Sequence, residues 1–220
     1  MTIIIRSYQP SDLPDCQNLF TASHDFYENP MFFVNMVLQT DMSDIEKNYL
    51  EAPDGHWWVA VSVVDGRVLG QVAGLPVSIA EPSYYKQLPE DEREKIYELR
   101  RMGVAADAQR DGIGSRLLST LTEFARNRGY RQVHVSTLTS MIRAREFYEK
   151  HGFVRGRIEK TLLGNIDMEN VEEAKETFKN LPTPTIFEIN DPIPEEDQRL
   201  MKISPKYSKH IYVQHYSLML

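Results

Sequence analysis

Two glycines, Gly112 and Gly114, stand at the start of a long run with helical apolar spacing, directly after Gln109, Arg110 and Asp111. A glycine inside a helix costs about 1 kcal/mol relative to alanine, so this pair needs a reason. The N–H groups of a helix's first turn point out of its end, where the helix dipole favours an anion. Glycines remove the Cβ atoms that would keep a pyrophosphate away. The pattern indicates an anion-binding turn, and its alternative is a plain turn before a surface helix.

Two other phosphate-binding motifs do not fit this turn. A dinucleotide fingerprint requires a third glycine, where this chain has Leu117, and an acidic residue after the next strand. A phosphate loop requires Lys followed by Ser or Thr after the second glycine, where this chain has Ser115 and Arg116. The remaining interpretation is a strand, a glycine turn and a helix whose N-terminus faces an anion.

The charge distribution supports an anionic ligand in the middle of the chain. The net charge is −7 over 220 residues, which argues against nucleic acid as a partner. Residues 96–160 nevertheless contain 13 Lys and Arg against 7 Asp and Glu. The basic middle lies between two acidic flanks, so we expect it to meet an anion. The alternative is a set of solvated helix faces.

Hydrophobic periodicity predicts the elements that position this turn. A strand at 96–105 precedes it, a helix at 113–128 follows, and a strand at 131–137 comes next, with Val133 and Val135 on one face and His134 at the surface. Other predicted elements before the turn are a first strand at 2–8, a helix at 11–20, irregular helices at 21–50, a hairpin around Asp65-Gly66 and a long connection at 80–95. Those after it are a helix from 140 that Gly152 closes, a strand that begins at Phe153, a short acidic helix at 170–180, a proline-rich connector at 181–198 and a last strand at 209–220. Strands that alternate with helices imply a mixed, partly parallel sheet with helices on its faces.

Several classes of protein are excluded by what the chain lacks. No apolar run approaches the roughly 18 residues that span a bilayer, and the N-terminus does not resemble a signal peptide. The single cysteine, Cys16, rules out an intramolecular disulfide and fits a half-buried packing thiol in a reducing compartment. The histidines form no metal-ligand pattern, so we expect no metal. A cytoplasmic location is the simplest expectation.

Two motifs together resemble those of the GCN5-related N-acetyltransferase (GNAT) superfamily. "QRDGIG" matches its Gln/Arg-x-x-Gly-x-Gly/Ala pattern, and "AREFYEKHGF" resembles its Ala-x-x-x-Tyr-x-x-x-Gly-Phe signature. The resemblance covers Tyr97–Val154 well and the preceding hairpin moderately. Within the superfamily, 41–77 and 98–118 are similar to the camello-like branch, which includes aspartate N-acetyltransferase. Those relatives have a hydrophobic membrane segment near their first helices, and this chain shows none.

The resemblance implies a fold, a cosubstrate and a set of site residues. The fold would be one α/β GNAT domain over 1–220, with a mixed, mostly antiparallel sheet of about seven strands splayed at the cofactor site, helices on both faces, and a helical and proline-rich decoration at about 160–205. The cosubstrate would be acetyl-CoA. Glu98 would act as the base and Tyr148 as the acid that protonates the coenzyme A sulfur. The expected cofactor contacts are Met102, Gly103, Val104, Gln109, Arg110, Asp111, Gly112, Ile113, Gly114, Ser115 and Arg143.

Each implied role has a structural alternative. Glu98 could instead pair with Arg100 or Arg101, and Tyr148 could be a core residue of its helix. Gly103 is consistent with a β-bulge whose backbone N–H groups would bind the thioester carbonyl. Many family members carry an Asn where this chain has Met141. Ser140 or Arg143 would then supply that contact, with Arg145, Arg155 and Arg157 adding positive charge or remaining solvated.

The acceptor is expected to be a small amine of amino-acid type. Arg100 and Arg101 beside the base suggest a carboxylate, and the aromatic residues of 20–50 and 76–96 would line a pocket or fill the core: Phe26, Tyr27, Phe32, Phe33, Tyr84 and Tyr85. One alternative is a protein or peptide acetyltransferase, which the acidic flanks would suit. Another is a non-catalytic acyl-CoA-binding module. An oligomer is left open.

Overall fold

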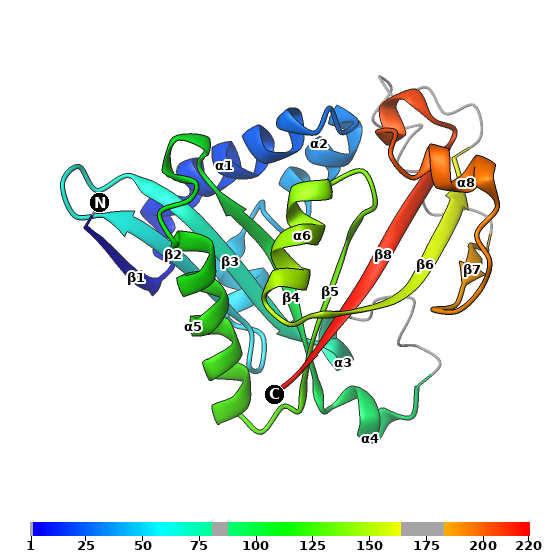
Figure 1. Ribbon diagram of the computed structural model, residues 1–220. Helices are drawn as coiled ribbons and strands as arrows, with labels where there is room; N and C mark the ends of the chain where they lie inside the picture. Colours follow the sequence, from blue (N-terminus) through cyan, green and yellow to red (C-terminus); the bar gives the residue numbers. More distant parts are fainter. Residues whose placement is uncertain (1, 81–87, 164–182) are drawn as a thin grey trace. The chain divides into compact units, whose positions relative to one another are not determined.

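Eight strands form a mixed, mostly antiparallel sheet in the order β1-β2-β3-β4-β5-β8-β6-β7 (Figure 1). This is a computed structural model that describes residues 2–80, 88–163 and 183–220. The expected sheet had about seven strands, and the short β7 accounts for the difference. The strands are β1 (Ile3–Ser7), β2 (His56–Ser62), β3 (Val68–Pro76), β4 (Ile96–Val104), β5 (Gln132–Leu138), β6 (Val154–Leu162), β7 (Thr185–Phe187) and β8 (His210–Met219).

Helices lie close to the predicted positions at 11–50, 113–128 and 140–152, but the long connection expected at 80–95 contains a further short helix at Glu90–Arg93. They are α1 (Leu13–Phe26), α2 (Met31–Gln39), α3 (Val77–Ala80), α4 (Glu90–Arg93), α5 (Ile113–Asn127), α6 (Ile142–Lys150) and α8 (Glu195–Leu200), with single turns η1 (Pro10–Asp12), η2 (Glu46–Leu50), η4 (Ala106–Ala108) and η5 (Pro205–Tyr207). Within the described residues, no helix has the length and apolar character that crossing a membrane requires.

The described residues divide into two compact units. The first comprises Met1–Ser23, Thr40–Val135 and Met219–Leu220, and the second comprises His24–Gln39 and Ser136–Leu218. Strand β5 and helix α1 each run from one unit into the other. The predicted hairpin, the predicted glycine turn and Glu98 belong to the first unit, and Tyr148 and Arg143 belong to the second.

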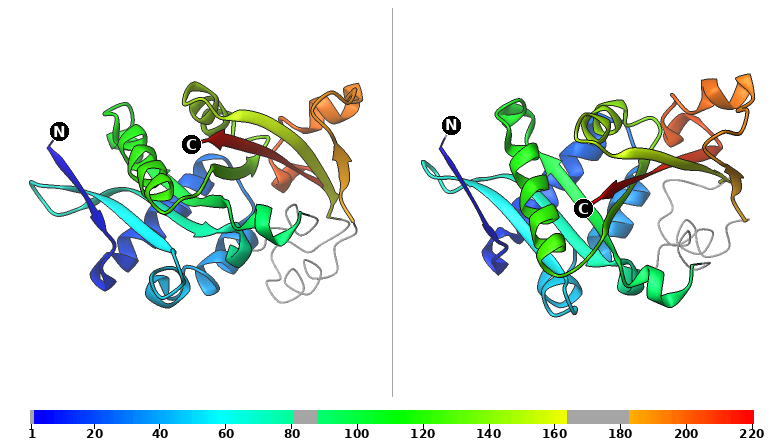
Figure 2. Two further views of the ribbon diagram at one scale, coloured as in Figure 1. Left: turned by 90° about the horizontal axis from the view of Figure 1, so that it is seen from below. Right: turned by 60° about the horizontal axis from the view of Figure 1, so that its bottom comes forward.

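In the first unit, α5 covers one face of the β1–β4 sheet (Figure 2). The predicted hairpin is present, with Gly66 in the left-handed region at φ +73°. On β3, a Cβ at Gly70 would lie 2.9 Å from Ile113 Cγ2, and one at Gly74 would lie 2.2 Å from the Tyr97 ring. These glycines therefore let α5 and the Tyr97 ring pack directly against the β3 backbone.

The other face of this sheet packs against α1 and η2. Trp57 on β2 is fully buried and meets the ring of Tyr49 edge to face at 4.9 Å between centroids. Cys16 on α1 is wholly buried rather than half-buried. Burial raises the pKa of the Cys16 thiol to about 12, so this thiol is protonated at neutral pH and serves packing, as expected.

Strand β4 has different neighbours along its length. It pairs with β5 in parallel over Ile96–Glu98 and Gln132–His134, and with β3 in antiparallel fashion as far as Val104. The parallel pairing therefore stops at Glu98, which fits the predicted splay of the sheet at this strand. Glu98 is the last β4 residue that pairs with β5.

In the second unit, β6 pairs with β7 on one side and with β8 on the other. Ile158, Met201 and Tyr212 form one buried hydrophobic cluster of this unit. The predicted acidic helix at 170–180 lies outside the described residues. The predicted proline-rich connector is more ordered than expected, because it contains β7 and α8. The three residues of β7 pair with the edge of β6. A strand of three residues is too short to show a clear alternation of apolar and polar side chains in the sequence.

A half-buried histidine in the first unit makes stability depend on pH. His56 contacts Ser7 Oγ at 2.9 Å through Nε2 and packs against Trp58 at 4.3 Å between ring centroids. Burial and the nearby Arg128 charge lower the pKa of His56. The unfolded chain then binds a proton more readily, with a pKa of about 6.5. Stability from neutral His56 is therefore present above that pH and lost as pH falls through the folded pKa.

We expect wild-type protein to lose more stability between pH 7.5 and pH 5.5 than His56→Gln loses. Glutamine keeps a polar group near Ser7 but does not titrate. Urea unfolding at the two pH values measures the difference. Equal pH dependence in both proteins would contradict the proposed role of His56.

Candidate functional site

The glycine turn has an unusual backbone. Gly112 is the N-cap of α5 at φ +76°, and Arg110 two residues earlier has φ +75°. Left-handed backbone costs a non-glycine residue roughly 1–2 kcal/mol, so Arg110 is strained where Gly112 is not. A Cβ at Gly112 would meet nothing within 4 Å. Glycine is therefore required at 112 by backbone conformation and not by packing inside the protein.

This turn presents backbone donors at an exposed surface. The first helical hydrogen bond runs from Arg116 N to Gly112 O at 3.1 Å, so the N–H groups of 113–115 precede it and point out of the helix end. The side chains of 109–112 are exposed, and Ile113 is buried and anchors the helix start against β3. Of the predicted contacts in this turn, Ile113 can therefore contribute only its backbone.

A β-bulge interrupts β4 where the resemblance places the thioester-binding N–H groups. Gln71 pairs with Gly103 and Ala73 pairs with Arg100, so two residues of β4, Arg101 and Met102, lie opposite Val72. The bulge expected at Gly103 is present, but it lies one to two residues earlier. A bulged residue is left out of the ladder, which leaves backbone polar groups available at this point of the strand.

The bulge, and not Gly103, contains the strained residue. Arg101 has φ +50°, and its side chain holds this conformation through Asp41: Nε and a terminal nitrogen each lie 2.8 Å from Asp41 Oδ2. A glycine at 103 serves close packing and not backbone conformation, because a Cβ there would lie 3.1 Å from Ser23 Oγ on α1. The Arg101–Asp41 pair thus fixes the bulge, and Gly103 allows α1 to approach.

Glu98 is buried on the face of the sheet that α1 covers. Its exposure is 7%, with Oε2 3.8 Å from Arg100 Nε and Oε1 4.0 Å from His134 Nδ1. These separations are longer than hydrogen bonds. Glu98 therefore has two basic side chains close by, and neither of these two contacts is close enough to be a hydrogen bond.

The interpretation of His134 as a surface residue is wrong. His134 is 1% exposed and pairs with Glu98 in the parallel ladder. Parallel strands are covered on both faces, so alternation along β5 does not mark a solvent side. His134 is a neighbour of the predicted base that sequence reasoning missed.

Arg100 and Arg101 have different surroundings. Arg101 is bound to Asp41, as described above, and its guanidinium lies over the ring of Phe20. The terminal nitrogen of Arg100 lies 3.9 Å from Asp41 Oδ2, and its side chain is 26% exposed. Burial alone would lower the pKa of Arg100, but the charges of Tyr49, Glu98 and Asp41 outweigh it and the net shift is upward. Neither of these two carboxylates lies within hydrogen-bond distance of Arg100, since Glu98 is 3.8 Å away and Asp41 is 3.9 Å away.

Asp41 and Tyr49 are part of this cluster and had no signal in the sequence. Tyr49 is fully buried, and its hydroxyl donates to Asp41 Oδ2 at 2.5 Å. Asp41 Oδ1 is buried and has no hydrogen-bond partner among the described residues. Both residues come from a loop and a single helical turn more than forty positions before β4, where neither periodicity nor a motif singles them out.

In the second unit, Tyr148 is buried on α6. Its ring lies near Phe153 and Tyr216, with centroids 5.4 and 6.1 Å away. Burial, together with the nearby Tyr27 and Tyr216, raises the pKa of Tyr148. No hydrogen bond joins its hydroxyl to any residue in the described ranges. Tyr148 is therefore protonated at neutral pH, as a proton donor must be.

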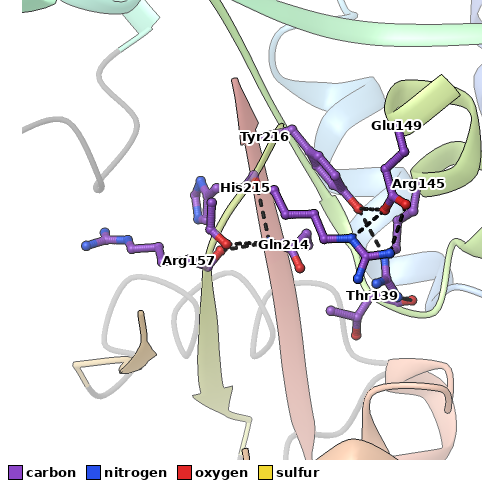
Figure 3. A network of polar contacts seen from close by, with 9 residues as sticks. Thr139, Arg145, Glu149, Arg157, Gln214, His215 and Tyr216 are labelled. Carbon is purple, nitrogen blue, oxygen red and sulfur yellow. Dashed lines mark hydrogen bonds and ion pairs between the residues drawn. The ribbon is translucent and has the colours of Figure 1, made fainter. Parts of the chain in front are cut away.

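A polar network holds the helix that carries Tyr148 (Figure 3). Tyr216 on β8 donates its hydroxyl proton to Glu149 Oε1 at 2.8 Å. Arg145 donates to the Thr139 carbonyl at 2.9 Å, and Arg155 binds both oxygens of Glu149 at 2.7 and 2.8 Å. These contacts fix α6 against β6 and β8.

The four arginines proposed for the cofactor therefore differ in their surroundings. Arg145 and Arg155 belong to the network on α6, and Arg157 binds Glu159 at 2.6 Å. Arg143 is exposed, with its guanidinium over the ring of Phe26 at 4.5 Å from the centroid. Arg143 is thus the one with an exposed, stacked guanidinium. Ser140 Oγ is buried and without a hydrogen-bond partner among the described residues.

The aromatic residues proposed for the acceptor site do not share one role. Phe32 on α2 is 3% exposed and belongs to the core, whereas Phe26 is 55% exposed. Tyr27 and Phe33 are half-buried. Tyr84 and Tyr85 lie outside the described residues. No cluster of three or more metal-binding side chains occurs within the described ranges.

The chain is similar to named acetyltransferases over its first two thirds. The sequence model of the acetyltransferase (GNAT) family matches residues 16–153. N-acetyltransferase 8 of Homo sapiens is 37% identical over 121 residues, which is 55% of this chain and 48% of that protein. N-acetylaspartate synthetase of Xenopus tropicalis is 32% identical over 141 residues, 63% of this chain and 46% of that protein. These relatives belong to the camello-like branch that the motifs predicted, and the chain spans about half the length of the curated relatives it matches.

Solved structures share the fold. An acetyltransferase from Streptococcus agalactiae 2603 superposes with a TM-score of 0.58 at 18% identity, covering 99% of this chain and 98% of that one. A GNAT-family acetyltransferase from Staphylococcus aureus Mu50 has a TM-score of 0.55 at 18% identity, covering 70% and 85%. At this identity the likeness concerns the fold alone. The match of the family model to well over half of the chain, over the glycine turn and β4, shows that the chain belongs to the acetyltransferase (GNAT) family.

Proposed function

We propose that this chain is an acetyl-CoA-dependent N-acetyltransferase whose acceptor is a small primary amine bearing a carboxylate. The observation that carries the proposal is the order of groups along β4: the buried Glu98, the partly exposed Arg100, and then the bulge at Arg101 and Met102. The glycine turn follows on the same chain segment. The names of two relatives, an N-acetyltransferase and an N-acetylaspartate synthetase, support it.

The cosubstrate would bind along the glycine turn and the β4 bulge. Gln109–Ser115 would hold its pyrophosphate through backbone N–H groups at the start of α5, an arrangement that suits anions. Arg110 and Arg143 are exposed and would add positive charge. The N–H groups of Met102, Gly103 and Val104 would stabilise the oxyanion, because preorganised donors stabilise charge that develops in the transition state.

Two proton transfers would accompany acetyl transfer. Glu98 would accept the proton of the attacking amine through a water molecule, since only a neutral amine is nucleophilic. The amine nitrogen would form a bond to the thioester carbon, and the carbon–sulfur bond would break as the intermediate collapses. Tyr148 would give its proton to the departing thiolate, and the product would be an amide and the free thiol of coenzyme A.

The experiment that tests the function is a panel of amino acids, each with its decarboxylated amine, assayed for acetyl-CoA-dependent thiol release. We expect turnover of amino acids and much weaker turnover of the matched amines. Reaction of peptides alone would instead support a peptide acetyltransferase. Tight acetyl-CoA binding without turnover of any amine would support a non-catalytic binding module.

Arg100→Met tests whether Arg100 recognises the carboxylate of the acceptor. We expect the amino-acid KM to rise by roughly 10–100-fold, the range of a charged hydrogen bond, with little change for decarboxylated amines. Arg101→Met is the matched control, because it leaves Asp41 without its close partner and should lower Tm. Equal KM changes for both acceptor classes would refute carboxylate recognition by Arg100.

Gly112→Ala and Gly129→Ala test the glycine turn as a pair. Both glycines are left-handed, at φ +76° and +87°, at the two ends of α5, and a Cβ at either meets nothing within 4 Å. Each variant should therefore lose a similar amount of stability, about 1–2 kcal/mol. Only Gly112→Ala should weaken acetyl-CoA binding, by at least tenfold in calorimetry. Equal affinities would remove Gly112 from the cofactor site.

A further inference from the structure

Gln71 is a polar side chain buried without partners in the middle of the sheet. It is 0% exposed, and neither Nε2 nor Oε1 has a hydrogen-bond partner among the described residues. Burying an amide without hydrogen bonds is unfavourable, whereas an apolar side chain of the same shape would avoid this cost. A group of this kind requires an explanation, such as an ordered water or a functional role.

The place of Gln71 in the sheet suggests that role. Gln71 on β3 pairs with Gly103 on β4. This regular pair lies next to the bulge at Arg101 and Met102. Side chains of paired residues lie on the same face of a sheet, so Gln71 shares its face with Arg100 and Glu98 on β4. The unpartnered amide is therefore next to the backbone groups that the bulge leaves unpaired.

Space and a third polar group are available beside Gln71. The residue opposite is Gly103, which has no side chain, and the next residue on this face of β3 is Ala73. Ser23 Oγ on α1 lies 3.1 Å from the position of a Cβ at Gly103, and its proton goes to the Leu19 carbonyl at 2.8 Å. A buried water requires two to four polar partners, and the amide, the bulge backbone and this hydroxyl provide that number.

We propose that Gln71 is a positioning residue for the β4 bulge, and that its carboxamide holds the backbone of Arg101–Gly103 through an ordered water. This inference rests on the proposed function, in which the N–H groups of that bulge stabilise the oxyanion. Gln71 and the Arg101–Asp41 pair would then both hold the bulge. Its contribution is expected in the rate of transfer and not in the affinity for the acceptor.

Gln71→Met is the informative variant, because methionine has nearly the same shape and lacks the amide. We expect a higher Tm, a kcat about tenfold lower at saturating acetyl-CoA, and an acceptor KM within twofold of wild type. Ser23→Ala should lower kcat in the same direction. Leu69→Met is the matched control, since Leu69 is fully buried two residues away on β3; its kcat should not change.

A merely structural Gln71 gives a different result. If Gln71→Met raises Tm while kcat stays within twofold of wild type, the positioning role is refuted. A crystal structure of the wild-type chain supplies a test that needs no activity: we expect a water within hydrogen-bond distance of the Gln71 amide and of the backbone of 101–103. An amide that touches apolar atoms alone would overturn the inference. A wild-type chain that does not bind acetyl-CoA would instead refute the proposed function.

Discussion

Tyr148→Phe is expected to lower kcat by about 100-fold, within the range of general acid catalysis, while Tm stays the same or rises slightly. The hydroxyl makes no hydrogen bond to any residue in the described ranges, so its loss removes no protein contact. Its pKa is raised by burial and by the nearby Tyr27 and Tyr216, so the proton is present at neutral pH. The proposed role of Tyr148 as proton donor therefore predicts a loss of rate without a loss of stability.

Tyr216→Phe is the matched control for this prediction. Its ring is a neighbour of Tyr148, and its hydroxyl donates to Glu149 and accepts from Arg145 at 3.3 Å. Removing that hydroxyl should lower Tm and leave kcat nearly unchanged. Comparing the two variants therefore distinguishes the loss of proton donation from the loss of stability. A Tyr148→Phe enzyme with wild-type kcat at several pH values would show that Tyr148 is a core residue and not the acid.

The glycine turn and the bulge show how far sequence reasoning extends. The sequence predicts the place of the turn before α5 and gives the missing Cβ at Gly112 as access for an anion. The structure adds a left-handed backbone at φ +76°, which other residues adopt at a cost, and anion binding by Gly112 stays a prediction. The bulge was predicted for the wrong reason. Gly103 is a glycine because α1 approaches it, and the strained residue is Arg101, whose left-handed φ is held by Asp41. The partner that stabilises the bulge lies sixty residues away in the sequence.

The buried polar residues were the hardest to predict. His134 follows the alternation of a half-exposed strand, but β5 is covered on both faces and the residue is buried. Gln71 lies in an apolar run, where its amide carries no local signal. The burial of each of these two side chains depends on which strand lies beside its own, and tertiary pairing decides that. Periodicity therefore located the strands, but it did not identify which polar side chains share the face of Glu98.

Glu98→Gln should reduce kcat/KM by about 100- to 1000-fold at neutral pH. The amide keeps the shape of the carboxylate but accepts no proton from the amine, so the variant depends on acceptor that is already neutral in solution. Its rate should therefore recover as the pH approaches the pKa of the acceptor amine. A pH profile of kcat/KM measures this recovery, which a merely structural defect would not produce.

Glu159→Gln controls for the loss of a buried carboxylate. Glu159 is 8% exposed on β6 and, like Glu98, has an arginine two positions away and a histidine on the neighbouring strand. Its pair with Arg157 is closer, at 2.6 Å against 3.8 Å for Glu98 and Arg100. Burial alone would raise the pKa of Glu159, but His215 and Arg157 outweigh it and lower the pKa. Glu159→Gln should therefore lower Tm and change kcat/KM far less; an equal loss of kcat/KM in both variants would indicate that Glu98 acts through stability and not as the base.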